Sequence, residues 1–120
     1  MNMSASYLQR GEALDYPNAS GAKIDAGTVV VLTAGKAGRI GVIGTDIPDG
    51  EVGSVHVAGV FEMPKSSSNA LTLGEAVYWD GTGITEADND GEGTPTYYPV
   101  AGFVAVAAAA GDSTVAVKIG

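Results

Sequence analysis

The 120-residue chain contains no cysteine and one histidine. Without cysteine it can form no disulfide scaffold, no Cys-liganded zinc site and no thiol nucleophile. The single histidine, His56, excludes a metal site built on a histidine pair, and any Ser-His-Asp triad would depend on it. His56 falls within a predicted strand, where a half-exposed structural role is the simpler interpretation. We therefore predict a protein that is not an enzyme and that needs no metal or other cofactor.

Basic residues are also scarce, because six Lys and Arg stand against 14 Asp and Glu, for a net charge of −8. The six are scattered, which argues against a nucleic-acid partner, since phosphate binding depends on clustered Lys and Arg. No apolar run approaches the roughly 18 residues that span a membrane. The first residues, MNMSASYLQRGE, have neither the basic start nor the apolar core of a signal peptide. We expect a protein that acts without export and without a membrane.

Glycine and short valine-rich segments are abundant instead. Beta-branched residues in short runs bounded by turn formers are typical of strands. Such runs occur at 28–32, 40–44, 54–61, 75–79, 100–106 and 113–119. In the last run Val115, Val117 and Ile119 share one side, and nowhere do eleven residues keep a helical period. The sequence predicts an all-β domain.

One turn pattern repeats four times: an apolar residue, two spacers, a glycine and then a strand. The turn glycines are Gly27, Gly50, Gly74 and Gly111. The second pair is spaced more widely than the first, as if a duplicated unit carried an insertion. That insertion, at about 80–96, holds an acidic stretch that we interpret as a solvated loop. The repeated pattern therefore indicates an internally duplicated unit.

The run of four alanines at 107–110 looks helical at first, since alanine is the best helix former. Sliding the chain by 61 positions aligns these alanines with the segment before Gly50, which contains the turn-forming Pro48 and Asp49. Four residues are also too few to sustain a helix without packing. We predict an extended segment and a tight turn there.

Two further features bear on binding. The acidic stretch at 86–92 imitates the start of a calcium loop, but the twelfth position is Tyr97 rather than a bidentate glutamate. Tyr78 and Trp79 suggest either a stacking platform or, more simply, a core or subunit interface.

The first 20 residues lie outside the repeats, and we divide the chain into an N-terminal arm, 1–20, and a β domain, 21–120. The arm carries Tyr7, Leu8, Leu14 and Tyr16 among polar residues. Aromatic residues are favoured interface anchors, so we expect this arm to contact a partner. The alternative is an ordinary edge strand of the domain.

The order of these turns and strands resembles a known family. The segments GEALDYPNASGAKIDAGTVVVL from Gly11, IPDGEVGSVHVAGVFEMPK from Ile47, LGEAVYWD from Leu73 and AGDSTVAVKI near the C-terminus carry the likeness. They resemble the small capsid cement, or decoration, proteins of tailed bacteriophages, a family long carried as a domain of unknown function. The likeness covers nearly the whole chain.

The resemblance implies a non-enzymatic virion protein that binds the outer surface of the phage head and ties neighbouring major capsid subunits together. It also implies a compact β-sandwich or barrel that self-associates, with a trimer favoured over a dimer. The protein would be in the host cytoplasm during assembly and then on the capsid. An acidic protein would be repelled by packaged DNA, which suits an outer location.

Three alternatives belong to other classes. Tyr78, Trp79 and the acidic loop could serve a carbohydrate- or host-surface-binding module. The protein could instead be a tail component of the same virion. A hydrolase using His56 is the third and weakest alternative.

Overall fold

The computed structural model describes residues 5–120 and contains nine strands and no helix in that range. The strands are β1 (Ala13–Pro17), β2 (Val29–Thr33), β3 (Arg39–Ile43), β4 (Val52–His56), β5 (Gly59–Pro64), β6 (Ala76–Trp79), β7 (Ile84–Thr85), β8 (Val100–Val106) and β9 (Thr114–Ile119). The all-β prediction is confirmed. The four alanines are extended and end in a turn, as expected.

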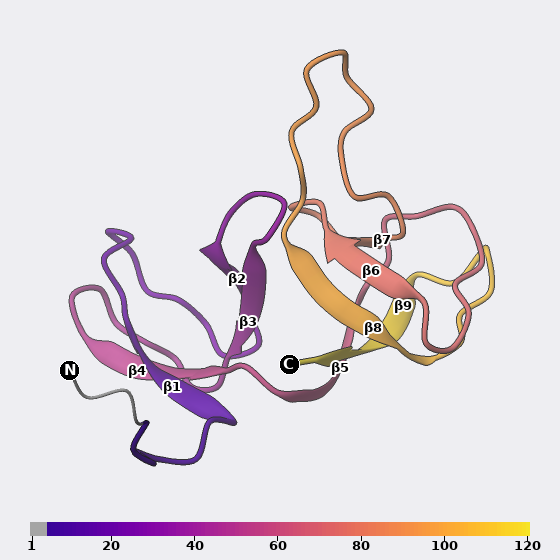
Figure 1. Ribbon diagram of the computed structural model, residues 1–120. Coiled ribbons are helices and arrows are strands. Elements are labelled where there is room, and N and C mark those ends of the chain that lie inside the picture. Colours follow the sequence, from indigo (N-terminus) through magenta and orange to yellow (C-terminus); the bar gives the residue numbers. More distant parts are fainter. Residues whose placement is uncertain (1–4) are drawn as a thin grey trace.

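The strands form two halves with the same order, seen left and right in Figure 1. The first half runs β1-β4-β3-β2, and the second runs β5-β9-β8-β6 with β7 added at its edge. The halves join where Arg39 of β3 pairs in parallel with Val100 of β8. The result is one open, mixed nine-stranded sheet rather than two separate sheets or a closed barrel, because this pairing makes the two halves continuous.

The predicted duplication is confirmed by matching backbone bridges. Ile24 and Ile47 exchange two hydrogen bonds, of 3.0 and 2.8 Å. Leu71 and Ala108, which occupy the same places in the second half, exchange two of 2.9 Å. These are the apolar residues that begin the four repeated turns.

The strand register repeats as well. Val30 of β2 pairs with Gly41 of β3, and Val77 of β6 pairs with Gly102 of β8. In the outer pair, Leu14 of β1 faces Val55 of β4, and Phe61 of β5 faces Val117 of β9. Positions 13–33 therefore correspond to 60–80, at a constant shift of 47 residues. The extra length of the second half lies in residues 80–99, between β6 and β8.

The four turn glycines predicted from the repeats lie in turns in the structure. Gly27, Gly50 and Gly74 have φ angles of 87°, 80° and 87°. A positive φ disfavours every side chain, which explains glycine at these three positions. Gly111 is not among the glycines with positive φ.

The core has two parts. The larger cluster fills the second half and takes in Ile40 and Val42 of β3; among its members, Val77, Ile84, Val104 and Val117 are fully buried. The smaller cluster, Ile43, Ile47 and Val55, belongs to the first half, with Tyr16 packed against it. In β9, Val115, Val117 and Ile119 are all buried, as their alternation predicts.

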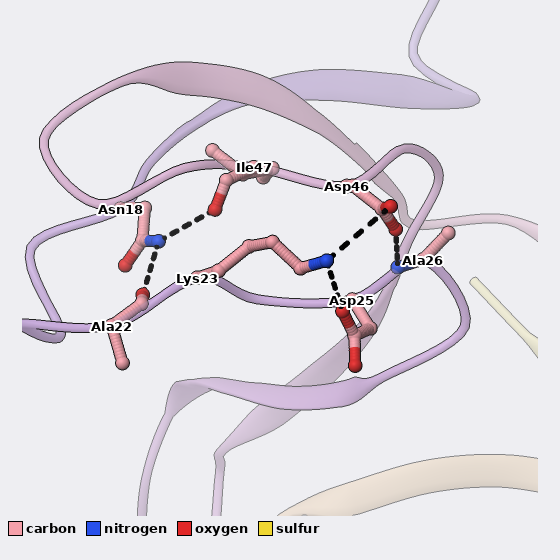
Figure 2. A network of polar contacts seen from close by, with 7 residues as sticks. All are labelled: Asn18, Ala22, Lys23, Asp25, Ala26, Asp46 and Ile47. Carbon is pink, nitrogen blue, oxygen red and sulfur yellow. Dashed lines mark hydrogen bonds and ion pairs between the residues drawn. The ribbon is translucent and has the colours of Figure 1, made fainter.

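A buried asparagine stabilises the first half (Figure 2). The amide of Asn18 donates to the carbonyl oxygens of Ala22 at 2.8 Å and Ile47 at 2.9 Å. Its own oxygen accepts from the backbone N–H of Ser20 at 3.0 Å and from the Ser20 hydroxyl at 2.7 Å. Both amide hydrogens and the oxygen of this side chain are therefore hydrogen-bonded, and these bonds hold the loop at 18–22 against Ile47.

The same place in the second half is occupied by Lys65. Its ammonium donates to the carbonyl oxygens of Ser67 at 2.6 Å and Ala110 at 3.1 Å. Two different side chains thus close equivalent loops by donating to backbone carbonyls.

An ion-pair cluster lies beside Asn18 at the surface (Figure 2). The Lys23 ammonium is 3.1 Å from an oxygen of Asp25 and 3.8 Å from one of Asp46. The hydrogen bond and charge of Asp25, with the charge of Asp46, raise the pKa of Lys23 above its ordinary value. Asp46 also accepts a 2.8 Å hydrogen bond from the N–H of Ala26. Because these side chains are largely exposed, the cluster contributes little to stability.

Two sequence expectations differ from the structure in detail. The run at 54–61 was expected to form one strand, but the chain breaks at Val57 and Ala58 into β4 and β5. Gly59 has a φ of 120°, which turns the chain from the first half into the second. Within the expected arm, residues 13–17 form β1, which pairs with β4 as the edge-strand alternative requires.

The acidic insertion forms a hairpin that projects away from both halves (Figure 1). Asn89 and Tyr97 form an antiparallel bridge in it, and the N–H of Tyr98 donates to Asp88 O at 2.9 Å. At its base, β7 pairs with the outer edge of β6.

Candidate interaction surfaces

The structure separates the six aromatic and leucine residues predicted to form an interface. Tyr7 and Leu8 are 84% and 90% exposed and belong to no strand. Leu14 is exposed on β1, whereas Tyr16 packs against the smaller core cluster. Tyr78 and Trp79 are half-buried on β6, far along the chain from the arm. They therefore do not gather into one site.

A groove of about 390 Å³ lies between the two halves. It is mainly apolar, and it is lined by residues from five strands and from the ends of β4 and β9: Leu14, Leu32, Arg39, Ile40, Val57, Val100, Ala101, Gly102, Phe103, Lys118 and Gly120. Leu14, Leu32, Val100 and Phe103 remain partly exposed there, so water contacts apolar surface that folding alone does not cover.

Two cations and no carboxylate side chain line this groove. The Lys118 ammonium lies 5.8 Å from the centre of the Phe103 ring and donates to the carbonyl oxygen of Gly120 at 2.9 Å. Arg39 is exposed and forms no ion pair with another described residue. The charged side chains that line the groove are thus all positive, on a chain whose net charge is −8.

A second hollow, of about 290 Å³, lies at the base of the acidic hairpin. Trp79, Tyr97 and Tyr98 contribute aromatic surface to it, opposite Val31 of β2. The Lys36 ammonium lies 5.0 Å from the centre of the Tyr97 ring. Of the two aromatic residues singled out on β6, Trp79 lines this hollow and Tyr78 does not.

Asp80 organises the turn beside that hollow. Its carboxylate accepts hydrogen bonds from the Ser66 hydroxyl at 2.6 Å, the N–H of Thr82 at 2.8 Å and the N–H of Gly83 at 2.9 Å. Burial opposes ionisation, but these hydrogen bonds outweigh it and hold the pKa of Asp80 below its ordinary value of 3.8. The carboxylate is therefore a structural acceptor.

This shift predicts an acid-sensitive contribution to stability. Between the folded and unfolded pKa values the unfolded chain binds more protons at Asp80, so stability falls as the pH is lowered from about 5 through the folded pKa. We expect the free energy of unfolding of Asp80→Asn to depend less steeply on pH in this window than that of the wild type. Urea unfolding at several pH values measures this. The control is Asp15→Asn on β1, an exposed carboxylate with no hydrogen bond among the described residues, which should keep the wild-type slope.

His56 is half-buried on β4 and lies 5.7 Å from the Phe61 ring, centre to centre. Within residues 5–120 no hydrogen bond joins its ring to a serine hydroxyl or a carboxylate. The half-exposed strand position expected from the sequence is confirmed. The same residues contain no group of three or more His, Cys, Asp or Glu side chains placed to hold a metal ion. In the part of the chain that is described, no helix is long and apolar enough to cross a membrane.

Sequence reasoning missed most of the groove. Phe103 and Lys118 are 15 positions apart and meet only because β8 and β9 pair in that register. Arg39 and Val100 come together at the junction of the two halves. The available signal was the alternation in β8, which leaves Phe103 on the opposite face from the buried Val104.

Comparison with known families agrees with the resemblance seen in the sequence. No curated protein and no solved structure matches the chain. The phage cement protein family matches residues 8–119, which is nearly the whole length and includes both halves and the groove between them. The chain therefore belongs to the phage cement protein family.

Proposed function

We propose that this protein is a non-enzymatic capsid cement protein that binds the outer surface of the phage head and stabilises contacts between neighbouring major capsid subunits. The observation that carries the proposal is the family match over residues 8–119. A protein that binds only the assembled shell stabilises it by mass action, and many copies on one shell add their contributions. No catalytic group is needed for this role.

The charge of the chain supports an outer position. A net charge of −8 would be repelled by packaged DNA inside the head. The protein would therefore meet the shell from the host cytoplasm during assembly and remain on its outside. Self-association of the protein, with a trimer favoured over a dimer, is part of the same proposal, because cement proteins must fit the symmetry of the lattice.

The proposal is tested by co-sedimentation of the purified protein with expanded, undecorated capsids of the virus that encodes it. Unexpanded procapsids serve as the control. Saturable binding to expanded shells, at a fixed ratio to the major capsid protein, is the expected result. Absence of binding to either shell would refute the proposal and favour a tail component of the virion.

Tyr7 and Leu8 are the first candidates for contact with the capsid. They are the most exposed of the exposed large hydrophobic residues in the described chain. We expect the double substitution Tyr7→Ala and Leu8→Ala to weaken capsid binding roughly tenfold or more, since buried aromatic anchors dominate interface energies. The melting temperature should not change, because neither side chain packs against the domain.

The matched control for this pair is Leu73→Ala with Val106→Ala, two exposed apolar residues of the second half. Titration of expanded capsids with both double variants measures the difference. Equal affinities would show that the N-terminal segment is not a capsid anchor. A deletion for the same purpose should end at residue 11, because the Glu12 carbonyl accepts a hydrogen bond from the N–H of Val57 and β1 begins at Ala13.

A second candidate function is favoured by the aromatic hollow at the base of the acidic hairpin. Trp79, Tyr97 and Tyr98 offer flat surfaces of the kind that stack on sugar rings. Binding to a glycan array that Tyr97→Ala abolishes would support a carbohydrate- or host-surface-binding role. Such binding could accompany the cement function or replace it.

A further inference from the structure

Two residues that line the groove can be compared with their equivalents in the second half. Leu14 and Leu32 of the first half correspond to Phe61 and Trp79 of the second, at the shift of 47 residues. Phe61 and Trp79 pack against the larger core cluster. Leu14 and Leu32 instead line the open groove. The first half therefore has leucines, which line the open groove, at the two positions where the second half has aromatic rings packed against its core.

The groove collects exposed apolar surface that has no cover in the described chain. Phe103 is 43% exposed, and Leu14, Leu32 and Val100 are exposed to a similar degree. A volume of about 390 Å³ accommodates a large side chain and the backbone that carries it. An apolar hollow of this kind favours an apolar anchor from a partner.

The positive side chains of the groove favour a partner that carries a carboxylate. Arg39 has no carboxylate partner among the described residues, and Lys118 uses one donor on a backbone carbonyl. No Asp or Glu side chain lines the groove, although the whole chain carries 14. An arginine at the rim of an apolar hollow is suited to a carboxylate, because its planar fork can donate two parallel hydrogen bonds.

We propose that this groove is the docking site for an extended segment of a major capsid subunit that carries a large apolar side chain next to a carboxylate. The apolar side chain would enter between Leu14, Leu32 and Phe103, and the carboxylate would pair with Arg39. The inference rests on the proposed cement function and adds the place and chemistry of the contact. A second copy of the chain is the alternative occupant, and the crosslinking test below distinguishes it from a capsid subunit.

The first test fills the groove from within. Leu14→Phe combined with Leu32→Trp copies the residues of the second half and should weaken binding to expanded capsids roughly tenfold or more. Val52→Phe, at an exposed position of β4 outside the groove, adds a similar ring and should leave binding unchanged. Retained folding of each variant is checked by its melting temperature.

The second test removes charge without adding volume, which keeps the proposal testable if the filled variant does not fold. Arg39→Gln should lower capsid affinity about five- to tenfold and reduce the dependence of binding on salt. Lys36→Gln, an exposed cation outside the groove, is the matched control and should change neither. Equal binding by the wild type, Arg39→Gln and the filled variant would overturn the proposal while leaving the cement function intact.

The third test identifies the occupant. A photoreactive benzoylphenylalanine placed at Phe103 should crosslink to the major capsid protein on expanded shells, and the captured peptide should contain an acidic residue beside a large apolar one. The same group at Val106, an exposed position of β8 outside the groove, should give little of this adduct. An adduct between two copies of this chain would overturn the proposal. If the wild type binds no capsid at all, the cement function fails and this inference fails with it.

Discussion

Replacement of Gly102 by alanine is expected to unfold this protein at a temperature about 12–20 °C below the wild type, a loss of roughly 3–5 kcal/mol. Gly102 lies on β8 with a φ of 148°, which side chains rarely adopt. An added Cβ would also overlap the backbone carbonyl oxygen of Lys118 on β9. Because the obstacle is main chain, the two strands can relieve it only by separating.

Two matched variants make this prediction specific, with thermal unfolding as the measurement. At Gly111 nothing lies within 4 Å of an added Cβ, so Gly111→Ala should change the melting temperature little. Gly41 is the counterpart of Gly102 in the first half, and its added Cβ would lie 2.6 Å from a methyl of Val55 and 3.1 Å from the carbonyl oxygen of His56. A side chain can yield more easily than a backbone, so Gly41→Ala should have an intermediate effect. Equal stability of all three variants would contradict the β8–β9 packing described above.

Replacement of Asn18 by alanine is the second large effect that we expect, at about 2–4 kcal/mol. Asn18 is buried, and its amide donates to the carbonyl oxygens of Ala22 and Ile47 (Figure 2). Its oxygen accepts from the N–H and the hydroxyl of Ser20. Alanine would remove all four hydrogen bonds of this side chain and open a small void. Each such hydrogen bond contributes on the order of 0.5–1.5 kcal/mol. Urea unfolding of the variant measures the loss.

Asn69→Ala is the control for this substitution. Asn69 is an exposed asparagine whose amide makes a 2.7 Å hydrogen bond to Glu86, and its loss should cost less than about 1 kcal/mol. A similar loss for both variants would show that burial of Asn18 contributes nothing. Lys65→Ala offers a further comparison, because Lys65 closes the equivalent loop in the second half with two hydrogen bonds instead of four.

The two halves keep a common frame but differ at their surfaces. Both keep the glycine turns, the bridges at Ile24 and Leu71 and the order of four strands. Only the second half carries the projecting acidic hairpin and the additional strand β7. Leu14 and Leu32 leave the groove open, whereas Phe61 and Trp79 complete the larger core. Duplication thus supplied a stable unit whose copies could diverge at their surfaces.

Local features were predictable because their causes are local. The positive φ at Gly27, Gly50 and Gly74 makes glycine necessary in those turns, so the repeat was visible as spacing. Beta-branched runs between such turns predict strands without knowledge of their partners. The family resemblance depends on the same ordered turns, which is why it could be recognised from the chain alone and agrees with the match over residues 8–119.

The sequence by itself determined an acidic, all-β, internally repeated chain with no cysteine and a single histidine. Only the tertiary structure decided that the two halves share one open sheet, that β1 belongs to the first half, and that Arg39, Phe103 and Lys118 converge on one groove. The physical reason is that strand propensity and turn chemistry act over a few residues. Register and strand partners arise from contacts between segments distant in sequence, and the groove exists only where those segments meet.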